Sequence, residues 1–278
     1  MRLGAHLSIA KGLDKAAETA ANIGANTFQF FTRNPRGGRA RIITEKEAAS
    51  WQAKRRQHDL FPVVGHLPYT VNMAAAAEKS FAFAKMVISD DLQRMDAVGV
   101  EYLVVHPGSH VGAGREKGIK KIIESLEEAF IPSRGKTMLL LETMAGQGTE
   151  VGSLRDIQEI LSALGHPERL GVCLDTCHLT AAGYDFLQKE EVARLADDLA
   201  ELVGLERVKA LHINDSMFPP NSKRDRHARI GQGYLGREGI LNVIAHPVFS
   251  GLPLLLETPV DDYLEYKDEI ELLRSWTE

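Results

Sequence analysis

Short hydrophobic runs alternate with longer amphipathic stretches along the whole chain. The runs are continuously apolar or β-branched and stop at turn residues, which is typical of strands buried on both faces of a parallel sheet. The predicted strands cover residues 2–7, 27–31, 62–65, 102–105, 138–141, 170–174, 208–213 and 253–256. The amphipathic stretches predict helices at residues 16–23, 45–58, 79–98, 116–130, 154–164, 190–202, 237–245 and 263–275.

Eight strand–helix alternations predict an α/β fold of the (β/α)8 type, the TIM barrel, as a single domain over residues 1–278. A doubly wound open sheet is the main alternative. The first predicted strand is not followed by the GxGxxG pattern of a dinucleotide site, which counts against that alternative. Residues 214–235 form the longest predicted loop, and long loops inside compact domains are often functional.

Potential metal ligands stand where the predicted strands end or in the long loop. They are His66, His106, Glu142, Asp175, His178, His212, Asp225, His227 and Glu257. The carboxyl ends of the strands of a barrel meet at one face, so we expect these side chains to form a cluster there. Imidazole and carboxylate ligands together suit Zn²⁺, and also Mn²⁺ or Fe²⁺. With a bridging carboxylate, nine ligands suffice for about three ions.

A lone histidine at a strand end is more often a hydrogen-bonded structural residue than a ligand. We expect that role for His58, His110, His166 and His246, and a supporting role for His6. The other five histidines differ because each has a carboxylate or another histidine close by in sequence or in barrel order. Metal clusters of this kind bind phosphoryl oxygens, provide hydroxide near neutral pH and stabilise a leaving oxygen, so phosphodiester hydrolysis is the favoured chemistry.

The two cysteines, Cys173 and Cys177, flank Asp175, and on a strand all three would share a face. A small buried hydrophobe is the favoured role for each, and a thiolate ligand is the alternative. Two cysteines in one segment make no disulfide framework, which indicates a reducing cytoplasm. No apolar run approaches the ~20 residues that span a bilayer, so we expect no membrane association.

The formal net charge of −5 argues weakly against nucleic acid as a partner. Three divalent ions would more than offset this charge, and the charge of bound metal belongs in the electrostatics of such a site. Basic residues also gather within residues 33–41, 54–56 and 223–229. Solvated loops and a nucleic-acid contact have equal weight for such clusters, but residues 54–56 are expected to be a helix surface.

Several motifs together resemble endonuclease IV, the metal-dependent apurinic/apyrimidinic endonuclease family of base-excision repair. They run in order from GAHLS through HPGSH, LLETMAGQG, GVCLDTCH, LHINDS and DRHARIGQG to LLLETP. The resemblance implies a TIM barrel with three zinc ions, for which Mn²⁺ is a candidate substitute. It implies three ligand groups: His66, His106 and Glu142; then Glu142, Asp175, His212 and Glu257; then His178, Asp225 and His227.

The resemblance also implies a reaction. Its substrate is duplex DNA with an abasic site, cut at the phosphodiester 5′ to that site to leave a 3′-hydroxyl and a 5′-deoxyribose phosphate. Blocked 3′ ends would be trimmed as well. Glu142 is implied as the catalytic residue that orients or deprotonates the attacking water, and Arg36 and Tyr69 as DNA contacts. A cytoplasmic monomer is the expected form.

Two other functions compete with this interpretation. A sugar isomerase or epimerase of the same barrel superfamily would also use His and carboxylate ligands, but with one or two ions. Asp225 and His227 favour the nuclease, because they complete a third ligand group. A DNA-damage binding module with a decayed site is the other alternative, and the presence of all nine ligands argues against it.

Overall fold

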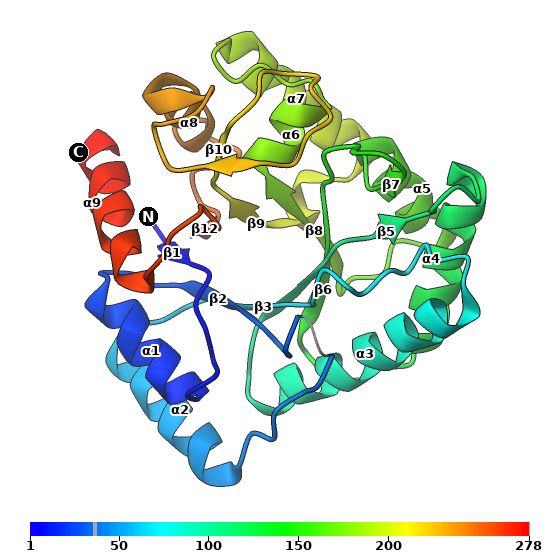
Figure 1. The fold of residues 1–278 in the computed structure, drawn as a ribbon, viewed down its shortest axis with the longest axis horizontal. Helices are drawn as coiled ribbons and strands as arrows, with labels where there is room; N and C mark the ends of the chain where they lie inside the picture. The colour runs from blue at the N-terminus through cyan, green and yellow to red at the C-terminus, as the bar shows by residue number, and fades with distance from the viewer. Residues whose placement is uncertain (36–37, 278) are drawn as a thin grey trace.

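The computed structural model describes residues 1–35 and 38–277. An eight-stranded parallel barrel stands at its centre, with helices around the outside (Figure 1). The barrel strands are β1 (Leu3–Ala5), β2 (Phe28–Phe31), β3 (Val63–His66), β4 (Tyr102–Val105), β6 (Met138–Glu142), β8 (Leu170–Asp175), β9 (Val208–His212) and β12 (Leu254–Leu256). Their order around the barrel is β1-β12-β9-β8-β6-β4-β3-β2. The predicted TIM barrel is confirmed.

The predicted helices are present, with ends that shift by up to three residues. The helices are α1 (Leu13–Asn22), α2 (Glu45–Gln57), α3 (Glu78–Ala97), α4 (Arg115–Ala129), α5 (Leu154–Ala163), α6 (Thr176–Ala182), α7 (Lys189–Leu202), α8 (Gly236–Ile244) and α9 (Tyr266–Thr277). Two N-termini show why the chain turns helical there: Thr44 accepts a hydrogen bond from the amide of Glu47, and Ser153 forms a capping box with Asp156. Helix α6 was not predicted. Within the described residues, no helix is both long and apolar enough to cross a membrane.

Two hydrophobic cores stabilise the barrel. The larger core lies between the strands and the surrounding helices, and it includes Phe28, Phe30 and Trp51, all fully buried. The smaller core fills the inside of the barrel and consists of Val64, Val104, Leu140, Cys173, Ala210 and Leu255. Successive residues of a strand point to opposite faces, so each strand gives one row to each core. The prediction that Cys173 is a small buried hydrophobe is confirmed.

The barrel closes where β1 meets β2. Between these strands, the described residues form an isolated parallel bridge, His6 with Gln29, in place of a continuous ladder. The amide of Leu7 donates to the carbonyl oxygen of Gln29 at 2.7 Å. Gly4 permits this approach, because a Cβ atom there would lie 1.8 Å from the carbonyl oxygen of Thr27. Closure of the sheet therefore depends on the missing side chain of Gly4.

Gly4→Ala should destabilise the protein, because the new methyl group would push against backbone that cannot rotate away. We expect a loss of roughly 1–3 kcal/mol in the free energy of unfolding, measured by urea denaturation. Gly251→Ala is the matched control, since a Cβ atom there meets nothing within 4 Å. Equal stabilities for the two variants would contradict this account of barrel closure.

Candidate metal centre

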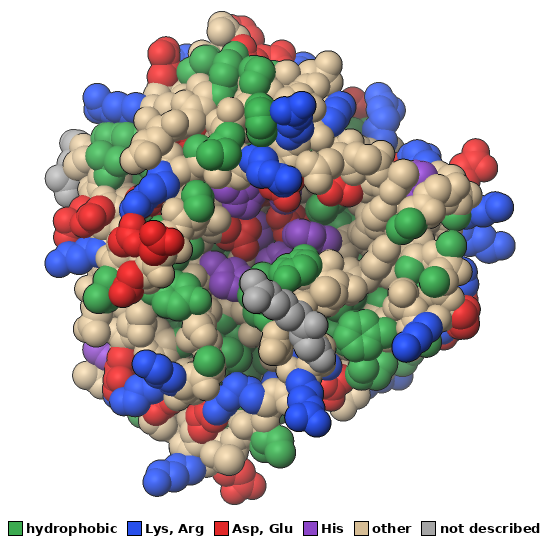
Figure 2. All heavy atoms as spheres, viewed as in Figure 1, with side chains coloured by type: hydrophobic (Ala, Val, Ile, Leu, Met, Phe, Trp, Pro, Cys, Tyr) green, Lys and Arg blue, Asp and Glu red, His purple; other side chains and the backbone are tan. Residues whose placement is uncertain are grey.

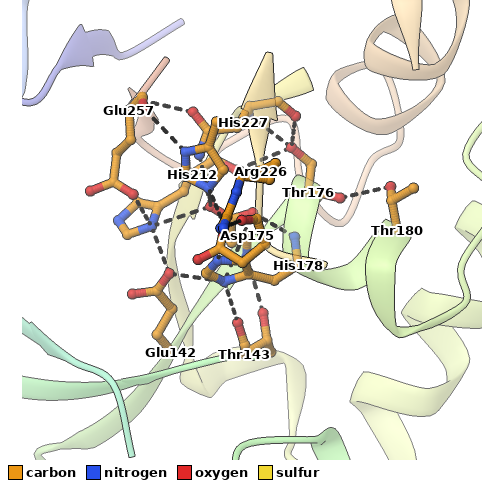
Figure 3. A network of polar contacts seen from close by, with 12 residues as sticks. Glu142, Thr143, Asp175, Thr176, His178, Thr180, His212, Arg226, His227 and Glu257 are labelled. Carbon is orange, nitrogen blue, oxygen red and sulfur yellow. Dashed lines mark hydrogen bonds and ion pairs between the residues drawn. The ribbon is translucent and has the colours of Figure 1, made fainter. Parts of the chain in front are cut away.

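Six of the nine predicted ligands continue the inner row of the barrel. Each stands two residues after a member of the inner core, so its side chain points into the barrel mouth just above that residue. The pairs are Val64 and His66, Val104 and His106, Leu140 and Glu142, Cys173 and Asp175, Ala210 and His212, and Leu255 and Glu257. The hydrophobic core thus forms the floor of the cluster, and the strands bring together residues far apart in the sequence (Figure 3).

Helix α6 brings a seventh side chain, His178, into the cluster. The strand β8 ends at Asp175, whose carboxylate accepts a hydrogen bond from the amide of His178 at 2.8 Å and so caps the helix. The prediction that Cys177 shares a strand face with Asp175 is therefore wrong, because Cys177 lies on α6. Burial raises the pKa of Cys177 to about 12, so this residue is a neutral thiol at physiological pH.

The long loop supplies Asp225 and His227. It contains the antiparallel pair β10 (Asp215–Ser216) and β11 (His227–Ala228), where the sequence predicted irregular chain. Asp215 anchors this loop. Its buried carboxylate accepts hydrogen bonds from the amides of Gly233, Leu235 and Gly236, at 2.9, 2.9 and 3.1 Å respectively. Asp215 was not among the predicted site residues, although an acid two residues beyond the predicted strand 208–213 in LHINDS was a usable signal.

Glu142 lies at the centre of the cluster and is fully buried. Its Oε2 atom is 3.0 Å from His66 Nε2 and 3.1 Å from His106 Nε2. Its Oε1 atom is 3.2 Å from His212 Nδ1 and 3.3 Å from His178 Nδ1. One carboxylate therefore contacts four imidazoles, two on each oxygen, and each oxygen could serve a different metal ion.

The described residues include sets of ligand atoms that lie within 4.8 Å of one another and could hold a metal ion. Three of the sets coincide with the groups that the resemblance implied: His66, His106 and Glu142; Glu142, Asp175, His212 and Glu257; and His178, Asp225 and His227. Two further sets overlap them: His66, His212 and Glu257; and Asp175, Cys177 and His227. The geometry thus brings all nine predicted residues together.

Backbone carbonyls orient three of the imidazoles. The Nδ1 atoms of His66, His178 and His227 lie 2.6, 2.9 and 3.1 Å from the carbonyl oxygens of Leu67, Thr143 and Glu257 respectively. A carbonyl oxygen only accepts, so each Nδ1 carries the hydrogen and each Nε2 faces the cluster. Among the described residues, the buried Nε2 atoms of His178 and His227 have no hydrogen-bond partner. Nitrogens left in this state fit a metal ion.

The carboxylates and imidazoles shift each other's pKa in opposite directions. Burial alone would raise the pKa of Glu142, but His106 and His212 outweigh it and lower the pKa well below its usual range. Burial alone would lower the pKa of His178, but Asp175 and other nearby carboxylates raise it well above its usual value. Metal binding would displace the imidazole protons, because a ligating imidazole is neutral.

The cluster lies at the floor of an open depression. Figure 2 shows histidine and acidic side chains at the centre of this face, with Lys and Arg side chains around it. A cavity of about 520 Å³ is lined in part by His6 and Phe31, which contact Glu257 and His66 of the cluster. A larger cavity of about 720 Å³ lies against α7 and α8. None of the nine ligands is among the described residues that line either cavity.

Of the two predicted DNA contacts, Tyr69 is among the described residues and Arg36 is not. Tyr69 follows β3 and is 54% exposed, with its ring centroid 6.3 Å from that of Phe31, which in turn packs edge-on against His66. Tyr69 therefore lies at the rim of the cluster. Arg36 lies outside the described residues, and its role stays a prediction.

Two of the remaining histidines have contacts that agree with the roles expected for them. His6 Nδ1 lies 3.1 Å from Glu257 Oε1, as a residue that supports a ligand would. His110 Nδ1 accepts a hydrogen bond from the amide of Gly114 at 3.1 Å and so orders a loop.

The chain is similar to known proteins over almost its whole length. A family model described as "Xylose isomerase-like TIM barrel" matches residues 17–276. A relative from Moorella thermoacetica, "Probable endonuclease 4", is 55% identical over 275 residues, which cover 99% of this chain and 98% of the relative. The chain belongs to the endonuclease IV family.

Solved structures agree with this family membership. Endonuclease IV from Thermus thermophilus is 35% identical and superposes with a TM-score of 0.86, over 100% of this chain and 99% of that one. A 3-keto-D-glucoside 4-epimerase from E. coli has a TM-score of 0.71 at 15% identity, over 99% of each chain. At that identity the likeness is one of fold alone. The sequence resemblance to endonuclease IV is confirmed, and the epimerase alternative is the weaker one.

Divalent metal should stabilise metal-free protein, since the cluster exists in the folded chain and not in the unfolded one. With Zn²⁺ at 100 times its dissociation constant, the free energy of unfolding should rise by about 2.7 kcal/mol. The melting temperature, measured by circular dichroism, should rise by roughly 5 °C. Asp175→Asn should reduce this increase, whereas His58→Ala, on the outer surface, should not. The same increase in both variants would place the bound metal elsewhere.

Proposed function

We propose that the whole chain, residues 1–278, works as one domain and is a metal-dependent DNA-repair endonuclease. It hydrolyses the phosphodiester 5′ to an abasic site in duplex DNA, leaves a 3′-hydroxyl and a 5′-deoxyribose phosphate, and trims blocked 3′ ends. The observation that carries this proposal is the position of Glu142, whose two oxygens contact four imidazoles where three ligand sets meet. Family membership supports the choice of substrate.

We propose three zinc ions as the resident metals, with Mn²⁺ as a substitute. One ion would be held by His66, His106 and Glu142, one by Glu142, Asp175, His212 and Glu257, and one by His178, Asp225 and His227. Bound there, the ions would polarise the phosphodiester and lower the pKa of water. Unpartnered imidazole nitrogens and buried carboxylates support this donor set.

Glu142 is the proposed catalytic residue. Its lowered pKa keeps the carboxylate ionised at neutral pH, so it can orient a water molecule or accept a proton from it. The inner core beneath it, Leu140 among its members, excludes bulk water from the floor of the site. The carboxylate is therefore held in one place by packing below and imidazoles on both sides.

Duplex DNA would bind over the depression. A missing base makes extrusion of the abasic sugar less costly, so the sugar can turn out toward the cluster in the depression. Tyr69 at the rim and Arg36 after β2 are the proposed contacts that stabilise the distorted duplex. The third ligand set, with His178, Asp225 and His227, favours this function over sugar isomerisation. We further propose a cytoplasmic monomer.

The proposed activity can be tested on a duplex that carries a single tetrahydrofuran abasic analogue, which cannot undergo β-elimination. Zinc-loaded protein should cut once, 5′ to the analogue, and leave a 3′-hydroxyl that a polymerase extends. Glu142→Gln keeps the size of the side chain and removes its charge. This variant should lower the rate at least 100-fold, about 2.7 kcal/mol in the barrier.

Chelator-treated protein serves as the second arm of this assay and should be inactive until Zn²⁺ is restored. Incision that persists without metal, or near-normal turnover by Glu142→Gln, would contradict the proposal. Interconversion of sugars in place of DNA cleavage would support the epimerase alternative.

The DNA contacts are tested by equilibrium binding to abasic duplex. Tyr69→Ala should weaken binding roughly tenfold, because an aromatic ring stacked on a base contributes about 1–3 kcal/mol, whereas Tyr69→Phe should keep most of the affinity. Arg36→Ala should weaken binding more than Lys54→Ala, since Lys54 forms an ion pair with Glu18 on the outer surface. Equal effects of the two charge deletions would argue against Arg36 as a specific contact.

A further inference from the structure

Gln29 is a buried polar residue in the otherwise apolar run FQFF of β2. It pairs in register with Val64, a member of the inner core, so its side chain points into the barrel. The closing bridge of the barrel joins Gln29 to His6. Gln29 therefore lies directly beneath the cluster, although nothing in its residue type marks it as a ligand.

Three contacts determine how the amide of Gln29 is oriented. Gln29 Nε2 donates to Glu257 Oε1 at 2.6 Å and lies 3.0 Å from His6 Nδ1, and Gln29 Oε1 lies 2.9 Å from His212 Nε2. Glu257 is one of the proposed metal ligands, and a carboxylate that binds a metal ion is ionised. An ionised carboxylate only accepts, so the amide NH₂ must face Glu257 and the amide oxygen must face His212.

The orientation of the amide then determines the tautomer of His212. An amide oxygen only accepts, so His212 Nε2 must carry a hydrogen, and Nδ1 is left to face the cluster. Nδ1 lies 3.2 Å from Glu142 Oε1, 3.3 Å from Glu257 Oε2 and 3.7 Å from Asp175 Oδ2. A lone pair and three carboxylate oxygens that converge in this way fit a metal ion.

Gln29 accepts a hydrogen bond from the imidazole of His212, as backbone carbonyls do from three other imidazoles. His66, His178 and His227 donate from Nδ1 to carbonyl oxygens, which no substitution can remove. The donor nitrogen of His212 faces a side-chain oxygen instead, that of Gln29. The position of this imidazole therefore depends on the residue at position 29.

We propose that Gln29 is a positioning residue of the metal centre, which sets the tautomer of His212 and the rotation of Glu257 and thereby raises the affinity of the Glu142, Asp175, His212 and Glu257 site. The inference deepens the proposed function and rests on its metal centre. Partners of this kind typically change metal affinity by roughly 10- to 100-fold when they are removed.

Gln29→Met tests the proposal, because it keeps the length of the side chain and removes its polar contacts with His212, Glu257 and His6. Competition with a chromogenic chelator should show at least tenfold weaker binding of the most affected Zn²⁺ ion. Thr27→Val is the matched control: it removes a different buried hydrogen bond just before the same strand, from Thr27 to the carbonyl of Pro62. It should lower stability without weakening zinc binding.

Zinc affinities of Gln29→Met within twofold of those of the unaltered protein would overturn the proposal. So would an equal loss of affinity in Thr27→Val, because the effect would then be one of general destabilisation. A second measurement needs no variant. Long-range ¹H–¹⁵N spectra of the zinc-loaded protein should show His212 protonated at Nε2 and metal-bound at Nδ1, and the opposite tautomer would overturn the proposal.

These readouts separate the inference from the proposed function. A protein that loses zinc affinity in Gln29→Met but does not cut abasic duplex would support the role of Gln29 and refute the endonuclease assignment. A protein that cuts abasic duplex while Gln29→Met binds zinc normally would refute the role of Gln29 alone. In an active enzyme, Gln29→Met should lower kcat at limiting zinc, and kcat should recover when the zinc concentration is raised. A change in KM with kcat unaltered would overturn the proposal.

Discussion

Charge burial is the constraint on which this structure depends. Glu142, Asp175 and His212 are fully buried at the mouth of a barrel whose floor is apolar. Removing such groups from water costs several kcal/mol each unless opposite charge compensates them. The imidazoles compensate part of the charge of the carboxylates, and bound cations would compensate the rest. Barrel, loop and helix α6 are all arranged so that this compensation occurs at one point.

The alternation of side chains along a strand explains how the chain forms this cluster with few residues beyond the strands themselves. A side chain two residues beyond a core position points the same way as that position, so a strand only has to extend past its apolar run to present a ligand. Val64 and His66 on β3, or Leu140 and Glu142 on β6, show this step. Folding of the core and assembly of the cluster are therefore one event, and a change in strand register would disrupt both.

The sequence predicted most of the fold and all nine members of the cluster, because both follow from local periodicity. It did not predict α6 or the β10–β11 pair, which form under the influence of single acids: Asp175 caps the helix, and Asp215 gathers amides of the long loop. The role of Gln29 was not predicted, because its partner His212 lies 183 residues away in the sequence. Its one local signal was a polar residue at an inward position of an apolar strand.

The incomplete pairing of β1 with β2 has a consequence for dynamics. Local opening of a protein follows its weakest backbone ladder, and this seam relies on a single bridge between His6 and Gln29. The same seam lies beside the cluster, since His6 and Gln29 both contact Glu257. A metal ion bound to Glu257 would fix the carboxylate that His6 and Gln29 contact from the two sides of the seam, so metal loading should also slow hydrogen exchange in β1 and β2.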